Sequence, residues 1–169
     1  MFFSIELIEP MIYKRFTIRP AGNKDIAAIK KLVSEVLQEY HLPFSETGKD
    51  DDLNDIEQNY FKRNGYFGTA IDTSTNEIVG TFGLYAKNKD ICELRKMYLI
   101  KTARGQGLGR FILMAAIELA KEKKYTKIVL ETITPLKEAI SLYKRYGFKE
   151  IPPSEINERV DQAFELQLL

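Results

Sequence analysis

The sequence has one cysteine, no tryptophan and no long apolar run, and each shortage excludes a class of protein. Cys92 alone cannot form an internal disulfide, which is typical of a protein kept in a reducing compartment. No stretch approaches the roughly 20 apolar residues that cross a membrane as a helix. The start MFFSIELIEP has no basic region before its apolar residues and does not resemble a secretory signal peptide. We therefore expect a cytoplasmic protein.

Charge of either sign is not in excess. The chain has 25 lysines and arginines against 24 aspartates and glutamates, for a net charge of +1. This balance does not favour nucleic acid or a membrane surface as a partner, and we expect neither. A chain of 169 residues, 44% of them hydrophobic, is long enough for one domain with its own core. We treat residues 1–10 as a loose N-terminal arm and residues 11–169 as a single domain.

The order of the predicted elements indicates an α+β fold built on one central sheet. Strand-like runs span residues 15–20, 66–72, 78–86, 91–100, 127–132, 147–151 and 164–169, and the last two are expected to pair. Apolar residues at helical spacing lie within residues 26–40, 53–60, 108–120 and 139–146. The turns between the second, third and fourth strands are short, so these strands must be antiparallel. We expect a three-layer α/β arrangement: a mixed, mostly antiparallel central sheet with helices on both faces.

The stretch TARGQGLGRF, residues 102–111, separates a strand from a helix and has glycine at every second position from Gly105 to Gly109. Glycine permits positive φ angles and lets a ligand approach the backbone. The free N–H groups of a helix N-terminus attract anions. Arg104 and Arg110 add positive charge on either side. This pattern predicts a phosphate-binding loop rather than an ordinary helix start.

Two common phosphate motifs fit this loop poorly. The P-loop G-x-x-x-x-G-K-[ST] is absent, and the dinucleotide fingerprint G-x-G-x-x-G fails at its third glycine, where Arg110 stands. Glu131, at the end of the next strand, lies about where a ribose-binding acid would lie. A fragment of a dinucleotide-binding oxidoreductase therefore remains an alternative.

Four blocks in a fixed order are more specific than the loop alone: ELRKMY at 93–98, R-x-x-G-x-G at 104–109, LET at 130–132, and A-I-x-L-Y-x-x-x-G-F at 139–148. Together they resemble the GNAT superfamily of acetyl-CoA-dependent N-acetyltransferases. The resemblance implies transfer of an acetyl group from acetyl-CoA to a primary amine, with the loop on the coenzyme A pyrophosphate. Many members carry asparagine where this chain has Leu136, which leaves one contact near the thiol open.

The resemblance also implies which residues bind the cofactor: Met97, Tyr98, Leu99, Arg104, Gly105, Gln106, Gly107, Leu108, Gly109, Arg110 and Tyr143. The backbone N–H groups of the 97–99 segment are expected to hold the thioester carbonyl, and a bulged strand would leave such groups unpaired. The Tyr143 phenol is expected to protonate the leaving thiolate. The alternative for Tyr143 is a core tyrosine that fills the helix face.

The general base is less certain from the residues alone. Glu93 is the first candidate, because strict strand alternation places it on the same face as Met97 and Leu99. The alternative is an ion pair between Glu93 and a neighbouring cation, Arg95 or Lys96.

The remaining candidates carry weaker signals. Glu131 is the second candidate base, because its strand must splay from its neighbour. His41, the only histidine, is the third, although a loop histidine is more often solvated. Cys92 is expected to be a packed, inert thiol. We predict no metal-ligating residues.

The acceptor class stays open. Six carboxylates between residues 46 and 57 could attract a cationic amine, or they could complement a helix N-terminus on a solvated face. A small-molecule amine or a peptide amine is the expected partner, and small enzymes of this fold often form homodimers. The alternative function is a catalytically silent acyl-CoA-binding regulatory module.

Overall fold

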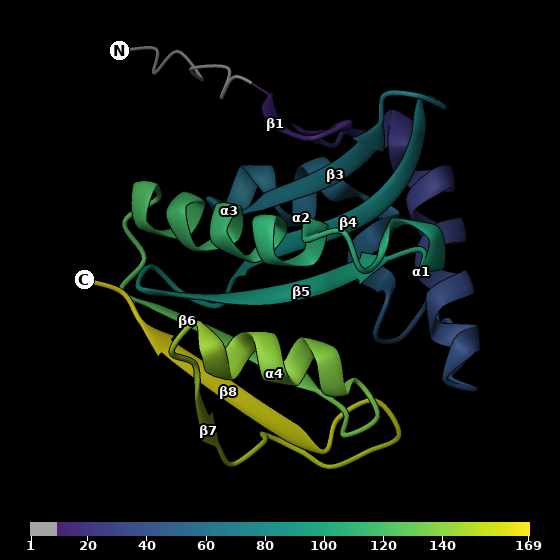
Figure 1. Ribbon diagram of the computed structural model, residues 1–169. Helices are drawn as coiled ribbons and strands as arrows, with labels where there is room; N and C mark the ends of the chain where they lie inside the picture. The colour runs from purple at the N-terminus through teal and green to yellow at the C-terminus, as the bar shows by residue number, and fades with distance from the viewer. Residues whose placement is uncertain (1–9) are drawn as a thin grey trace.

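The computed structural model describes residues 10–169, so nine residues of the expected N-terminal arm lie outside the described residues. One mixed sheet runs through the described chain in the order β1-β2-β3-β4-β5-β6-β8-β7 (Figure 1). Its strands are β1 (Met11–Tyr13), β2 (Phe16–Pro20), β3 (Tyr66–Asp72), β4 (Glu77–Ala86), β5 (Ile91–Leu99), β6 (Lys127–Thr132), β7 (Lys149–Ile151) and β8 (Gln162–Gln167). All neighbours pair antiparallel except β5 and β6. The expected α+β fold with a mostly antiparallel sheet is confirmed.

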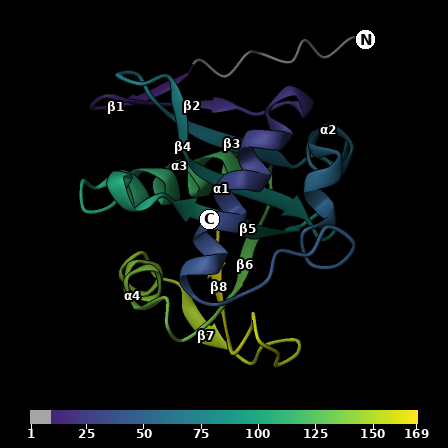
Figure 2. The same cartoon turned by 90° about the vertical axis from the view of Figure 1, so that its right-hand side faces the viewer.

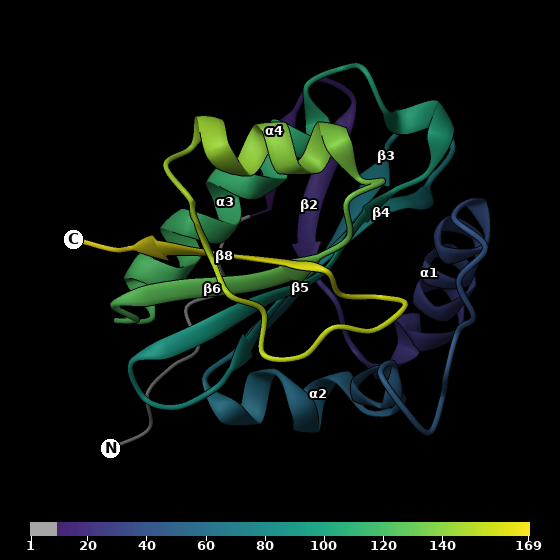
Figure 3. The ribbon, with the colours of Figure 1, turned by 90° about the horizontal axis from the view of Figure 1, so that it is seen from below.

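Helices cover both faces of the sheet. They are α1 (Ile26–Glu39), α2 (Ile56–Asn59), α3 (Leu108–Glu122) and α4 (Lys137–Arg145), with 3₁₀ turns η1 (Asn23–Asp25), η2 (Asp51–Asn54), η3 (Phe61–Arg63) and η4 (Lys101–Ala103). Helices α3 and α4 lie on one face and α2 lies on the opposite face, as the view from below shows (Figure 3). Figure 2 shows α1 beside α2 on that second face. Each pair of helices buries its own apolar cluster against the sheet.

The apolar patterns explain which helix surfaces are buried. In α1 the buried side chains recur at helical spacing (Ile29, Leu32, Val33, Val36 and Leu37), so one stripe packs against the sheet. Helix α3 buries a broader apolar surface, which shares one cluster with the sheet and with Ile140 and Tyr143 of α4. Strand β6 alternates strictly between half-buried and buried residues, which is the pattern of a strand with one face in the core.

Local details differ from the sequence expectations in three places. Residues 11–13 form β1, a strand that the residues did not predict; it pairs with β2. The sequence also favours Asn23 as the N-cap of the first helix, but its side chain instead bonds to Asp55 and to the backbone of Glu57. The second helix is only four residues long and is continued at both ends by 3₁₀ turns, although the expected apolar face (Leu53, Ile56 and Tyr60) is fully buried.

The sheet opens at its centre. Strands β5 and β6 pair in parallel only along Ile91–Glu93 and Lys127–Val129. Beyond these residues β5 still pairs with β4 and β6 with β8, but the two strands no longer pair with each other, and Figure 1 shows them diverging. A parallel pair normally keeps its hydrogen bonds along its length, so this divergence creates a break through the middle of the sheet. The glycine loop follows the C-terminal end of β5, so it lies at the end of the sheet where β5 and β6 have separated.

Candidate active site

The glycine loop presents free backbone donors. Gly105 and Gly107 have positive φ angles of 73° and 84°, and Gly107 is the N-cap of α3. Within residues 10–169, no hydrogen bond is made by the backbone N–H groups of residues 105–110; the first helical bond runs from the Phe111 N–H to the Gly107 carbonyl at 3.1 Å. Unpaired N–H groups at the positive end of a helix dipole form an anion site.

The turn between β1 and β2 supports the outer side of this loop. The Tyr13 hydroxyl and the Lys14 ammonium donate to the Gln106 carbonyl at 3.0 and 2.8 Å. Arg15 donates to the Gln106 side-chain oxygen at 2.7 Å, and the Tyr13 ring stacks on Phe111. The side chain of Gln106 is thus held by the protein, and its carbonyl is satisfied. These contacts join residues more than 90 positions apart, so no local sequence pattern predicts them.

The Arg104 side chain, expected at the phosphate, forms hydrogen bonds within the protein. Its guanidinium donates to both carboxylate oxygens of Glu39, at 2.8 and 3.1 Å, and also to the Leu99 carbonyl. The reason is spatial: the end of α1 lies against the start of the loop and supplies a carboxylate that is 19% exposed. Arg104 therefore ties α1 to the glycine loop. Arg110, the other flanking arginine, donates to the Tyr146 hydroxyl at 2.7 Å.

The Arg104–Glu39 pair is expected to stabilise the fold. Arg104→Gln and Glu39→Gln should each cost about 1–3 kcal/mol of unfolding free energy, because each removes bidentate hydrogen bonds between partly buried charged groups. Urea unfolding of both single variants and the double variant measures the coupling. We expect the double variant to lose little more than either single one; fully additive losses would contradict a direct pair.

Strand β5 carries a β-bulge just before the loop. Gly83 pairs with Arg95 and Thr81 with Tyr98, so two residues of β5 oppose the single residue of β4 between these pairs. Lys96, the first of the two, has a φ of 52° in the left-handed region. A bulge leaves its extra residue outside the ladder and turns the following backbone. A bulge is therefore present at Lys96 and Met97, at the start of the 97–99 segment, while Tyr98 and Leu99 pair in register with β4.

The bulge corrects one expectation about Glu93. Strict alternation placed Glu93 on the face of Met97 and Leu99, but the extra residue inverts the alternation. Met97 and Leu99 pack in the apolar cluster under α3 and α4, whereas Tyr98 packs in the cluster under α1 and α2. The side chain of Glu93 instead lies with Arg95 on the α1 side.

A cavity of about 370 Å³ occupies the break in the sheet. Met97, Leu136 and Tyr143 line it from the α4 side, and Leu37 of α1 and Tyr40, the C-cap of α1, line it from the other. Such a cavity joins the two faces between the diverging ends of β5 and β6. Two reactants can therefore approach the same point from opposite faces of the sheet.

Tyr143 lies in the cavity wall beside the bulge of β5. Its side chain is buried at 6% exposure, and its hydroxyl lies 4.0 Å from the sulfur of Met97 at the bulge. Burial, with a smaller contribution from Tyr98, raises the pKa of the Tyr143 phenol above its usual value. The phenol therefore stays protonated at neutral pH and retains a proton that it can donate. It also packs on Phe148 and Phe164, so it serves the core as well.

The two candidate bases both line the cavity but have different partners. The Glu93 carboxylate, 13% exposed, bonds to Arg95 at 2.8–2.9 Å and lies 3.6 Å from the Lys87 ammonium. This is the ion pair that the alternative reading predicted. Glu131 is half-buried, and it accepts a hydrogen bond from the Ser154 hydroxyl at 2.5 Å.

The two remaining candidates, His41 and Cys92, do not line the cavity. His41 is exposed in the turn after α1 and is not part of the cavity wall. Cys92 is fully buried, and burial raises the pKa of its thiol to about 12, as expected for an inert thiol. Among residues 10–169 no helix is long and apolar enough to span a bilayer.

Most of the six carboxylates of the acidic segment are engaged within the protein, whereas exposed Asp51 lines the cavity. Asp50 and Asp52 are buried and ion-paired, and Asp55 caps α2 by accepting from the Gln58 N–H at 2.9 Å. Glu46 pairs with Lys30. Sequence spacing could not show this, because the cations that neutralise Asp50 and Asp52 come from distant parts of the chain.

Comparison with known proteins fits this geometry. The description "Acetyltransferase (GNAT) family" matches residues 33–148, which span all four motif blocks. The chain belongs to the GNAT acetyltransferase family. It is 34% identical over 145 residues to the "Uncharacterized N-acetyltransferase YjgM" of Escherichia coli, covering 83% of both chains. It is 29% identical over 134 residues to the "Uncharacterized N-acetyltransferase C1271.07c" of Schizosaccharomyces pombe, covering 77% of this chain and 80% of that one.

Solved GNAT structures share the fold over nearly the whole chain. An acetyltransferase of the GNAT family from Staphylococcus aureus has a TM-score of 0.80 at 27% identity and covers 91% of this chain and 99% of its own. YncA of Salmonella typhimurium, solved with acetyl-CoA, has a TM-score of 0.72 at 18% identity and covers 91% and 94%. The dinucleotide-binding alternative is wrong, because the only parallel strand pair in the described sheet is β5–β6.

Proposed function

We propose that this GNAT protein transfers the acetyl group of acetyl-CoA to a primary amine by direct attack. One observation carries the proposal: a row of unpaired backbone N–H groups at residues 105–110 lies at the end of a strand whose bulge borders an open cavity. The relatives named N-acetyltransferases and the acetyl-CoA complex of YncA support it. Acetyl-CoA, when bound, supplies a thioester, an acyl group already activated for attack by an amine.

Each part of the chain then has a role. The N–H groups of residues 105–110 bind the diphosphate, and Leu99 packs beneath Gly109 to support the loop. The bulge in the 97–99 segment directs a backbone N–H at the thioester carbonyl, where negative charge develops as the amine nitrogen attacks the carbonyl carbon. Tyr143 delivers its proton to the sulfur as the carbon–sulfur bond breaks.

The attacking amine must lose a proton, and we assign its acceptance to Glu131, through water. Glu93 has two cationic neighbours that already neutralise it, whereas the partner of Glu131 is the neutral hydroxyl of Ser154. Within residues 10–169 Glu131 forms no ion pair, so its carboxylate can accept a hydrogen bond from water beside the amine. Glu93 then holds Arg95 and Lys87 in the cavity wall, on the side from which the amine approaches.

Glu131→Gln is expected to lower kcat/KM for the amine about a hundredfold at pH 7, in the range of general base catalysis. Glu93→Gln, the matched control on the neighbouring strand, should lower it less. Measuring both variants across pH with the same amine decides the assignment. A larger loss in Glu93→Gln would return the role to Glu93, and equal small losses would mean that the amine reacts without a dedicated base.

The proposed function is tested by release of coenzyme A thiol from acetyl-CoA in the presence of a panel of amines. Mass spectrometry of the products should show one added acetyl group on the acceptor. The panel should include polyamines, amino acids, aminoglycosides and lysine-containing peptides, because the paired charges of the cavity wall do not select one class. Tight acetyl-CoA binding with no transfer across the whole panel would favour a silent regulatory module.

A further inference from the structure

The residue at the bulge, Lys96, turns a charged side chain into the protein interior. Its ammonium lies 3.1 Å from an oxygen of Asp50 and 3.2 Å from an oxygen of Asp52, and it donates to the Lys49 carbonyl at 2.9 Å. The side chains of Lys96, Asp50 and Asp52 are 6%, 0% and 3% exposed. The two carboxylates thus lie within ion-pair distance of the ammonium, although Asp52 Oδ1 itself accepts no hydrogen bond within residues 10–169.

A second cation completes the cluster from the far end of the chain. The guanidinium of Arg159, 10% exposed, donates to both oxygens of Asp50 at 2.7 and 3.0 Å. Asp50 also accepts from the Ser45 N–H at 2.9 Å, and Asp52 accepts from the buried Tyr60 hydroxyl. Two cations thus face two carboxylates. Burial alone would raise the pKa of Asp50, but the bonds from Arg159 and Ser45 and the charge of Lys96 hold it below its usual value, so Asp50 stays charged.

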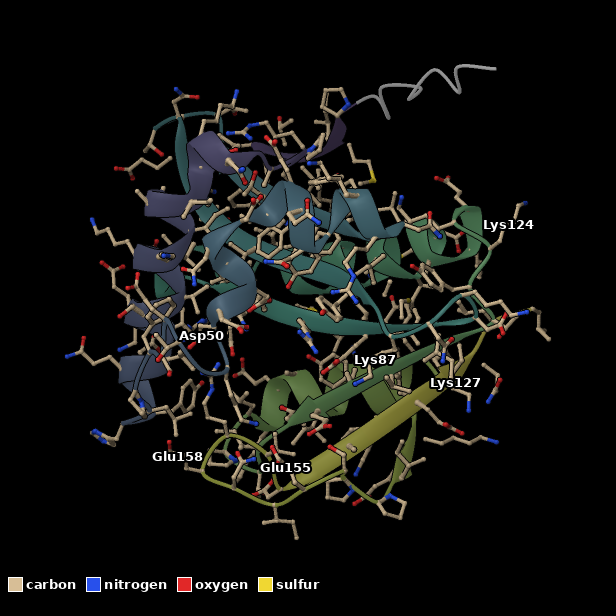
Figure 4. All side chains as sticks on the ribbon, turned by 180° about the vertical axis from the view of Figure 1, so that it is seen from behind. Asp50, Lys87, Lys124, Lys127, Glu155 and Glu158 are labelled. Carbon is tan, nitrogen blue, oxygen red and sulfur yellow. The ribbon has the colours of Figure 1, made fainter. Side chains whose placement is uncertain are left out.

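The four charged residues come from three segments that border the cavity. Lys96 belongs to the bulge, Asp50 and Asp52 to the loop between α1 and α2, and Arg159 to the loop between β7 and β8. Figure 4 shows Asp50 on the first loop, with Glu155 and Glu158 on the second loop across from it. Both loops supply residues to the cavity wall, among them Lys49 and Arg159.

The cluster holds one side of the bulge and Thr81 of β4 holds the other. The Thr81 hydroxyl, fully buried, donates to the Lys96 carbonyl at 2.7 Å. A lysine in the left-handed region is unfavourable and persists only where surrounding contacts determine it. Buried ion pairs add little net stability compared with apolar side chains of similar volume. Their use here is therefore geometric.

We propose that Lys96, Asp50, Asp52 and Arg159 form a positioning cluster that locks the bulge and both cavity loops into one reactive arrangement. The inference rests on the proposed acetyl transfer and deepens it. The cluster touches neither the glycine loop nor Tyr143 in the described structure, so it acts on the geometry of the reaction and not on diphosphate binding. It joins the site of the thioester carbonyl to the walls that receive the amine.

The test is the double variant Lys96→Gly/Asp52→Asn. Glycine keeps the left-handed backbone of the bulge, and the paired change removes one charge of each sign, so no buried charge is left uncompensated. We expect kcat to fall about a hundredfold, as for a misplacement of about 1 Å, while acetyl-CoA affinity by calorimetry stays within about twofold. A wild-type kcat in this variant, or a parallel loss of acetyl-CoA affinity, would overturn the proposal.

Two further variants guard against a trivial result. Arg159→Lys keeps the charge but loses the bidentate grip on Asp50, and it should lower kcat in the same direction by a smaller factor. Lys127→Met/Glu165→Gln removes an ion pair between β6 and β8, 3.1 Å long, that lies outside the cavity; its kcat should be unchanged. An equal loss of kcat in this control would mean that any lost ion pair has the same effect, which would overturn the proposal.

Hydrogen–deuterium exchange separates this inference from the proposed function. In Lys96→Gly/Asp52→Asn, exchange should accelerate together in residues 45–54, 97–99 and 154–160, and the glycine loop should be unaffected. If the wild-type protein acetylates no amine, the proposed function fails, yet this exchange pattern still decides whether the cluster couples the three segments. Unchanged exchange in these segments would overturn the cluster whatever the activity.

Discussion

Gly107→Asp is expected to abolish acetyl-CoA binding. Gly107 has a φ of 84°, and a Cβ at this position would overlap the Tyr13 hydroxyl. The added carboxylate would also lie among the N–H groups that receive the diphosphate. Two like charges about 4 Å apart repel by about 4 kcal/mol near a protein surface, which is about a thousandfold in Kd. Isothermal calorimetry with acetyl-CoA measures the loss directly.

Gly107→Asn is the matched control for this variant. Asparagine has the same size as aspartate and tolerates the left-handed region, so it carries the steric effect without the charge. It should weaken binding far less than aspartate, and both variants should unfold at similar temperatures. Acetyl-CoA affinity that is unchanged in Gly107→Asp would contradict a diphosphate site at this loop.

Tyr143→Phe is expected to lower kcat by about a thousandfold, within the range of general acid catalysis, with little change in the KM for acetyl-CoA. The change removes only the hydroxyl that lies 4.0 Å from the Met97 sulfur. Because burial raises the pKa of Tyr143, the wild-type enzyme should also keep its kcat up to the alkaline limit of protein stability. Steady-state kinetics across pH measure both effects.

Tyr125→Phe separates catalysis from core packing. Tyr125 is also buried, at 4% exposure, and its hydroxyl donates to the Asn64 carbonyl away from the cavity. Both variants should lose similar stability, but only Tyr143→Phe should lose kcat. If kcat is unaltered in Tyr143→Phe, the phenol belongs only to the core.

Local sequence patterns predicted the fold well because they act over short distances. The period of the apolar residues identified α1, α3 and the meander of β3, β4 and β5. A glycine-rich turn between a strand and a helix permits positive φ angles, and Gly105 and Gly107 both have them. The four motif blocks then identified the family.

Long-range contacts account for what the sequence could not predict. The sequence around Arg104 suggests a phosphate ligand and gives no sign of Glu39, which α1 brings into contact with its guanidinium. Lys96 has the appearance of an ordinary strand lysine in the sequence, because its partners Asp50 and Asp52 are 46 and 44 positions away. The inverted face of Glu93 depends on a single extra residue at the bulge, which alternation cannot reveal.

A crystal structure of the protein with acetyl-CoA tests the central claim most directly. The account predicts diphosphate oxygens about 2.7–3.2 Å from the backbone nitrogens of residues 105–110, with the thioester carbonyl at the bulge in β5. It also predicts the thioester sulfur within reach of the Tyr143 hydroxyl. Acetyl-CoA bound elsewhere, with the N–H groups of the glycine loop facing only protein or solvent, would contradict the account.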